Sequence, residues 1–320
     1  MHVRRLLHST VAAVALAASG SAVALEAEVV HWWTSGGESK AIGVIAEEFK
    51  NRGGTWIDTA VVGGSNARAA TINRILGGDP PTAMQWNIGV DVLELAEQDL
   101  INDIDAVATA GKWADVLPPL VVERATYDGK FVVVPVNVHA DNWMWYSPAI
   151  FEEVGLEPPT DWEQFLVDAE KIKAAGYIPV ALGGQPWQER ILFNSVLIGT
   201  AGKEAYRALY VDRDPEAARS EGVLKALEVF GKLRPFVDDG SPGRNWNDAT
   251  NLVLTGKAAA QFMGDWAKGE FAAAGMEPGK DYGCAMPPGN DDAYVLVVDV
   301  FAFAKTEDPE QREAQEVLAE

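Results

Sequence analysis

The chain is poor in the residues that form disulfides and metal sites. Its 320 residues include one cysteine, Cys284, and four histidines, of which only His31 and His139 follow residue 24. One cysteine cannot form an internal disulfide, so stability must come from a packed core. Two histidines and one cysteine are too few for a zinc cluster at the usual spacings. We therefore expect no metal and no cofactor.

Positive charge and long apolar runs are also scarce. The chain has 26 lysines and arginines against 47 aspartates and glutamates, a formal net charge of −21. A field of this sign repels nucleic acid and anionic lipid, so neither is an expected partner. After residue 24, no apolar run approaches the roughly 18 residues that a transmembrane helix needs.

The motifs of common enzymes are missing as well. There is no Gly-x-Ser-x-Gly and no calcium loop of the Asp-x-Asp-x-Asp-Gly type. Residues 199–203 are too closely spaced for a P-loop, and Glu204 stands where that motif needs Ser or Thr. A carboxylate pair for glycoside hydrolysis stays an alternative because acids are plentiful. The sequence favours a binding protein without catalysis.

The first 24 residues are typical of a secretory signal peptide. Arg4 and Arg5 supply the positive end, residues 11–18 form a short apolar stretch, and residues 22–24 (Ala-Val-Ala) form a small-residue cleavage site. The apolar stretch is too short to span a bilayer, although a retained anchor is the structural alternative. We expect a mature protein outside the cytoplasm.

The next section alternates between strands and helices. Strands are expected at residues 28–33, 56–62 and 82–86, with helices at 38–52, 66–76 and 90–98. This order predicts a parallel sheet with right-handed crossovers. Ligands bind such sheets at the carboxyl ends of the strands, where Trp32, Trp33 and Asn87 lie.

The pattern in the rest of the chain predicts a second lobe, followed by a segment that returns to the first lobe. We expect lobe one to begin with residues 25–135, lobe two to span residues 136–286, and residues 287–320 to return to lobe one. In lobe two, Thr160 is expected to cap a helix together with Glu163. A helix that begins at Asp308 has no terminator before residue 320, which we interpret as a truncated chain.

Aromatic rings at two places suggest a site for a sugar. Trp32 and Trp33 end the first strand, and Glu38 follows a Ser-Gly-Gly turn; Trp266 follows Gly264 in the second lobe. Indole faces stack on a pyranose, and carboxylates accept hydrogen bonds from its hydroxyls. The alternatives are core positions for one of the paired tryptophans and for Trp266, and an ordinary first-turn acid at Glu38.

An acidic residue interrupts the apolar strand expected at residues 295–304. A carboxylate such as Asp299 is costly there unless it is paired or hydrogen-bonded, so a ligand hydroxyl is the expected partner and a structural ion pair the alternative. His139 could also line the cleft, but a structural role is the stronger expectation for it, and His31 is expected to be structural.

Three separated segments resemble a known family. Residues 30–38, 155–165 and 263–271 resemble the extracellular sugar-binding proteins of bacterial ABC importers, in the maltose-binding-like group and most of all its glucose/mannose-binding members. The resemblance implies the periplasmic-binding-protein fold: two α/β lobes, each a mostly parallel sheet flanked by helices, with a ligand cleft between them. It also implies a monomeric periplasmic receptor that delivers a monosaccharide, glucose or mannose, to an inner-membrane ABC permease.

The resemblance also implies roles for single residues. Trp32, Trp33 and Glu38 match the family's first ligand loop, Trp266 its stacking ring and Asp299 its hydroxyl acceptor; Asn87 matches a polar or basic contact. Relatives continue beyond the position of residue 320, where glucose-binding members carry a further lysine and histidine. Two other functions stay open: a secreted carbohydrate-active enzyme, and a sugar sensor for a membrane kinase.

Overall fold

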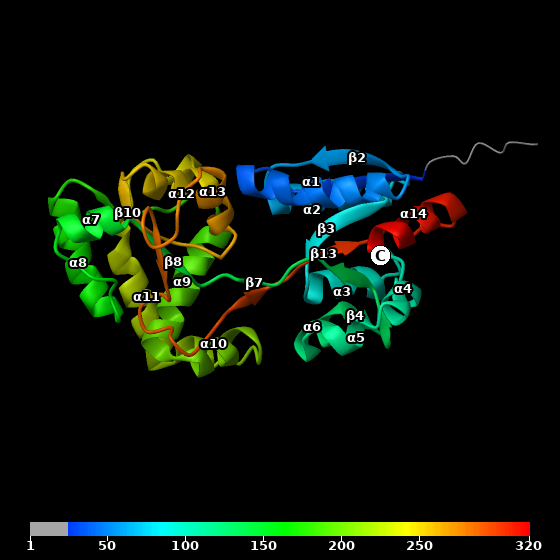
Figure 1. Ribbon diagram of the computed structural model, residues 1–320. Coiled ribbons are helices and arrows are strands. Elements are labelled where there is room, and N and C mark those ends of the chain that lie inside the picture. The colour runs from blue at the N-terminus through cyan, green and yellow to red at the C-terminus, as the bar shows by residue number, and fades with distance from the viewer. Residues whose placement is uncertain (1–24) are drawn as a thin grey trace, which may run out of the picture.

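The computed structural model describes residues 25–320, so the predicted signal peptide lies outside the described part of the chain. These residues form two α/β lobes connected by extended segments (Figure 1), as the sequence predicts. Within residues 25–320, no helix is both long enough and apolar enough to cross a membrane.

Lobe one is built on a five-stranded sheet with the order β2-β1-β3-β13-β6. The strands β1, β2 and β3 pair in parallel, as the alternating pattern predicts, whereas β13 is antiparallel to both of its neighbours. The strands are β1 (Glu26–His31), β2 (Thr55–Ala60), β3 (Ala83–Asn87), β6 (Val133–Pro135) and β13 (Asp299–Ala302), with a small hairpin of β4 (Thr126–Tyr127) and β5 (Lys130–Phe131).

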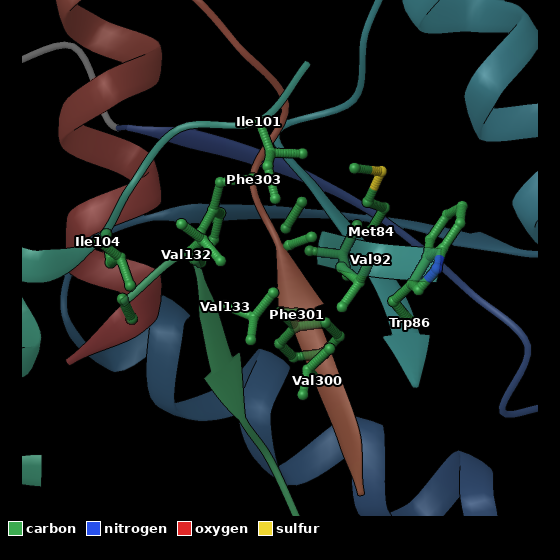
Figure 2. Close-up of a cluster of buried hydrophobic side chains, with 14 of the residues drawn as sticks. Met84, Trp86, Val92, Ile101, Ile104, Val132, Val133, Val300, Phe301 and Phe303 are labelled. Carbon is green, nitrogen blue, oxygen red and sulfur yellow. The ribbon is translucent and has the colours of Figure 1, made fainter. Parts of the chain in front are cut away.

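Helices and apolar side chains complete this lobe. Met84, Val133 and Phe301 lie on adjacent strands and are almost fully buried, and Figure 2 shows them in one cluster with side chains from the surrounding loops. Burial of this apolar surface is the main source of the lobe's stability. The helices are α1 (Gly36–Asn51), α2 (Gly64–Leu76), α3 (Val90–Glu97), α4 (Asp105–Ala110), α5 (Trp113–Val116), α6 (Pro119–Ala125) and α14 (Pro309–Ala319).

Lobe two contains a four-stranded sheet with the order β11-β8-β10-β9. Only β9 and β10 pair in parallel; β8 is antiparallel to both neighbours, so this sheet is more antiparallel than expected. The reason is that β8 enters directly from the other lobe, without the helical crossover that forces neighbouring strands to run in parallel. The strands are β8 (Met144–Tyr146), β9 (Ile178–Val180), β10 (Ala258–Phe262) and β11 (Gly283–Ala285).

Helices cover both faces of this second sheet (Figure 1). Its core includes Trp162, Phe165 and Phe262, whose rings contact one another. The helices are α7 (Pro148–Glu153), α8 (Trp162–Ala174), α9 (Pro186–Ala201), α10 (Lys203–Tyr210), α11 (Glu221–Leu233), α12 (Trp246–Leu254) and α13 (Ala267–Ala273), with short 3-10 turns η1 (Ala217–Arg219), η2 (Arg234–Phe236) and η3 (Ser241–Gly243).

The lobes are joined by an antiparallel pair, β7 (His139–Ala140) and β12 (Leu296–Val297). Just before β12, Asn290 still belongs to lobe two, because its Nδ2 donates to the carbonyl of Ser195 at 2.8 Å. We therefore propose that the chain returns to lobe one at β12, later than the crossing expected at residues 287 and 288.

The start of α8 differs by one residue from the sequence prediction. Asp161, rather than Thr160, is the N-cap, and its Oδ1 accepts from the amide of Gln164 at 2.8 Å. Aspartate is among the best N-cap residues because its carboxylate satisfies a helix amide and favours the positive end of the dipole.

We expect Asp161→Ala to lower the free energy of unfolding by about 1 kcal/mol, because the cap is lost. Thr160→Ala, the neighbouring control, should change it by no more than about 0.5 kcal/mol. Urea unfolding followed by circular dichroism measures both values. Equal losses in the two variants would contradict the assignment of the cap.

Candidate functional site

Four of the six predicted site residues, Trp32, Glu38, Asn87 and Asp299, lie at the edge of lobe one that faces the connecting strands. Asn87 ends β3 and is the direct strand partner of Asp299, which begins the antiparallel β13. Trp32 and Glu38 follow β1, the other neighbour of β3. The carboxyl ends of parallel strands share one sheet edge, so segments far apart in the sequence meet here.

Asp299 is the buried centre of this group and is only 6% exposed. One carboxylate oxygen accepts from Asn87 Nδ2 at 2.8 Å and the other from Asn137 Nδ2 at 3.2 Å, while His139 Nε2 lies 3.7 Å away. Burial raises the pKa of Asp299, and the His139 charge and the Asn137 hydrogen bond oppose that rise. The carboxylate is held by polar neighbours from β3 and from the segment that connects the lobes.

Glu38 has a structural role and also faces the site. With Ser35 it forms a capping box at the start of α1, and its Oε2 accepts from the amides of Thr34 at 3.1 Å and Ser35 at 2.9 Å. Burial raises the pKa of Glu38, and the nearby charge of Asp299 adds to the rise. The sequence alternative of a first-turn acid therefore applies, while Oε1 makes no hydrogen bond within residues 25–320.

His139 links the two lobes rather than serving one of them. Its Nδ1 is hydrogen-bonded to Asp265, whose other carboxylate oxygen accepts from the amide of Ala140 at 2.9 Å. Burial alone would lower the pKa of His139, but Asp265, together with the charges of Asp299 and Glu38, raises it. His139 therefore lies between carboxylates of both lobes, in line with the cleft position that the sequence left as the weaker alternative.

Trp266 brings an aromatic ring from lobe two to the same place. Its ring centroid lies 5.4 Å from that of His139, at nearly a right angle, and 6.2 Å from that of Trp187. A Cβ atom on Gly264 would lie 2.1 Å from the Trp266 ring, so only glycine allows this ring position. Within the Gly-Asp-Trp sequence, Gly264 leaves room for the Trp266 ring, and Asp265 is hydrogen-bonded to His139.

The paired tryptophans of lobe one point in different directions. Trp33 is 7% exposed and packs in the core, beside a hollow of about 330 Å³ whose lining residues all lie between positions 31 and 60. Trp32 is half-buried, with the Arg68 guanidinium 5.2 Å from its ring centroid and Gly64 against the ring. This matches the alternative in which one of the pair faces the core, because alternate residues of an extended segment face opposite sides.

The lobes also touch directly through α1 and α13, which lie end to side in Figure 1. The amide of Gly37, in the first turn of α1, donates to Glu270 Oε1 on α13 at 2.7 Å. A Cβ on Gly37 would lie 3.0 Å from the backbone of Gly269, so a glycine at position 37 allows the two backbones to approach this closely. The positive end of the α1 dipole favours this carboxylate.

Several polar side chains of the site were not predicted from the sequence. Arg68, Asn137, Asp265 and Glu270 all take part in contacts that join separate segments. In the sequence, the only indication of a role at the site is that some of them lie near the aromatic and acidic motifs, as Asp265 lies beside Trp266. Their partners depend on the fold and were not visible in the local pattern.

Comparison with known proteins gives a consistent result. A family model described as "Bacterial extracellular solute-binding protein" matches residues 33–319. A "Probable sugar-binding periplasmic protein" of Brucella melitensis is 41% identical over 87% of this chain and 66% of that protein, and one of Rhizobium meliloti is 39% identical over 94% and 73%. The chain thus spans just under two thirds of the Brucella relative.

Solved structures with low sequence identity share the fold. A chitin oligosaccharide binding protein has a TM-score of 0.78 at 19% identity, with 92% of this chain and 76% of the other covered. A bacterial solute receptor described as having an exclusive preference for β-D-galactopyranose has a TM-score of 0.77 at 20% identity, with 92% and 75% covered. Identities this low support the two-lobed fold alone.

We expect Glu270→Ala to weaken ligand binding about fivefold, because the charge-assisted hydrogen bond to Gly37 joins the lobes and is lost. Glu277→Ala is the matched control, since Glu277 is exposed in lobe two and its carboxylate pairs, among residues 25–320, with the nearby Lys280 alone. Isothermal titration calorimetry gives both Kd values. An unchanged Kd for Glu270→Ala would show that the contact does not contribute to binding.

We expect an NMR titration to place the pKa of His139 above 6.5, and Asp265→Asn to lower it. Because the folded-state pKa is raised, protonation favours the folded state. The stability gained is full below the unfolded pKa of about 6.5 and is lost as the pH rises through the folded value. A pKa that Asp265→Asn leaves unchanged would contradict the pairing.

Proposed function

The chain belongs to the bacterial extracellular solute-binding proteins, and from this premise we propose that it is an exported receptor that binds a neutral sugar between its lobes. One observation carries the proposal: two half-buried indole rings are each linked to Asp299, Trp266 of lobe two through His139 and Trp32 of lobe one through Arg68 and Asn87. That combination fits a ligand with flat apolar faces and many hydroxyl groups.

The chemistry of the cluster favours a neutral polyol. Glu38, Asp265 and Asp299 offer oxygen atoms that accept hydrogen bonds, and sugar hydroxyls are suitable donors. An anionic ligand would meet three carboxylates, opposed only by His139 and Arg68. The aromatic rings add stacking, which is independent of the charge of the ligand.

The names of the relatives support a sugar but leave its size open. The Brucella and Rhizobium relatives are named sugar-binding, and the fold neighbours include receptors for a galactopyranose and for chitin oligosaccharides. We propose a monosaccharide, glucose or mannose, because two aromatic side chains close over one sugar ring more easily than over a chain of rings.

The rest of the proposed function follows from family membership. The mature receptor would act in the periplasm as a monomer and deliver its sugar to an inner-membrane ABC permease. We propose binding without catalysis. Trp32, Glu38, Asn87, Trp266 and Asp299 are the proposed contacts, and Trp33 supports the Trp32 loop from the core.

A thermal-shift screen tests the proposed ligand class, because a ligand that binds only the folded state raises the midpoint of unfolding. The panel is D-glucose, D-mannose, D-galactose, diacetylchitobiose and D-glucuronate. We expect glucose or mannose to raise the midpoint most and glucuronate to leave it unchanged. A shift with glucuronate alone, or with none of the panel, would contradict the proposal.

We expect Trp32→Ala and Trp266→Ala each to weaken binding of the selected sugar by about 1–3 kcal/mol, the scale of ring stacking. Calorimetry measures the loss, and unfolding without sugar checks that each variant is folded. Tyr127→Ala, an exposed aromatic residue in the β4–β5 hairpin, is the control. Unchanged affinity in both tryptophan variants would reject the site.

A further inference from the structure

The proposed site is rich in acceptors and short of donors. Its carboxylates can only accept hydrogen bonds, whereas the oxygens of a sugar, including the ring oxygen, also need donors. The amides of Asn87 and Asn137 already donate to Asp299, and the imidazole Nδ1 of His139 is engaged by Asp265. Each of these amides keeps one further N–H, so the site offers few donors for the several oxygens of a sugar, and an additional strong donor would complement its carboxylates.

Arg68 is placed to supply it. Its guanidinium lies 5.2 Å from the ring centroid of Trp32 and 5.8 Å from that of Trp86, at the edge of lobe one that carries the proposed contacts. Only one of its five N–H groups has a hydrogen-bond partner within residues 25–320: Nη1 donates to Asn87 Oδ1 at 3.0 Å. No carboxylate of the described residues forms an ion pair with it, so four donors are free.

The hydrogen bond from Arg68 to Asn87 also fixes the orientation of the Asn87 side-chain amide. The Asn87 carbonyl oxygen faces Arg68 and its amide nitrogen faces Asp299, which gives a directed series from guanidinium to amide to carboxylate. Arg68 and Asp299 therefore occupy opposite ends of one polar series beside Trp32. One end donates and the other accepts, which is the arrangement that a sugar ring with adjacent oxygens needs.

We propose that Arg68 is a specificity-determining residue that donates a hydrogen bond to one acceptor oxygen of the sugar stacked on Trp32. The inference rests on the proposed function and assigns to this side chain a direct contact with the ligand. The competing interpretation is a purely structural role, in which the guanidinium only stacks on Trp32 and orients Asn87. The two differ because only a direct contact depends on a particular oxygen of the ligand.

The test compares sugar derivatives in wild-type protein and in variants of Arg68. The probes are D-glucose and D-mannose, their single deoxy and deoxyfluoro derivatives, and the carbocyclic analogues in which CH₂ replaces the ring oxygen. The variants are Arg68→Gln and Arg68→Lys, with Arg219→Gln as the control because Arg219 is exposed in lobe two and pairs only with Glu216. Calorimetry measures Kd, and urea unfolding without sugar confirms that each variant is folded.

We expect Arg68→Gln to weaken binding of the parent sugar at least tenfold. Arg68→Lys should weaken it less, since lysine keeps a charged donor but lacks the planar pair of N–H groups of a guanidinium. The loss should shrink to less than twofold for the one derivative that lacks the contacted oxygen. If the contacted oxygen is a hydroxyl, Arg68→Gln should still weaken binding of the corresponding fluoro derivative in part, because fluorine is a weak hydrogen-bond acceptor. Arg219→Gln should bind every probe like the wild type.

A loss of the same factor for every derivative would overturn the inference and leave Arg68 with a structural role, while the proposed sugar site would stand. Wild-type binding of the parent sugar with no loss in Arg68→Gln would overturn it as well. If the wild-type protein binds neither parent sugar, both the proposed monosaccharide and the contact assigned to Arg68 are wrong.

Discussion

The site depends on one buried carboxylate, that of Asp299. A charged group at this depth is costly unless its oxygens are hydrogen-bonded. The partners are Asn87 from β3 and Asn137 from the segment that leaves lobe one, with His139 slightly farther away. These partners fix β3, β13 and the connecting strand relative to one another, so the cost of burying Asp299 is offset by the same contacts that shape the site.

The two lobes are coupled by contacts of a similar kind. Asp265 of lobe two is hydrogen-bonded to His139 and to the following amide, and Glu270 of the same lobe accepts from the α1 amide of Gly37. In both contacts, a carboxylate of lobe two accepts a hydrogen bond from a group that does not belong to lobe two. A ligand that bridges Trp32 and Trp266 would add to this set, which gives a physical reason for binding and lobe closure to occur together.

The sequence predicted what is local. Alternating strands and helices gave the parallel half of lobe one, and the motifs around Trp32, Trp266 and Asp299 pointed to a region that the structure brings together. It did not predict the direction of β8, which is set by entry from the other lobe. It also did not predict the pairing of His139 with Asp265, which lies 126 residues away, and it left open which tryptophan faces the core. Such features depend on pairings that form only when both lobes have folded.

The most direct test of the central claim is a crystal structure of the chain with the sugar that gives the largest thermal shift. We expect the sugar ring to lie between Trp32 and Trp266, with hydroxyl oxygens about 2.7 Å from a carboxylate oxygen of Asp299 or Glu38. Density for the sugar outside the space between the lobes, or with no contact to either tryptophan, would contradict it.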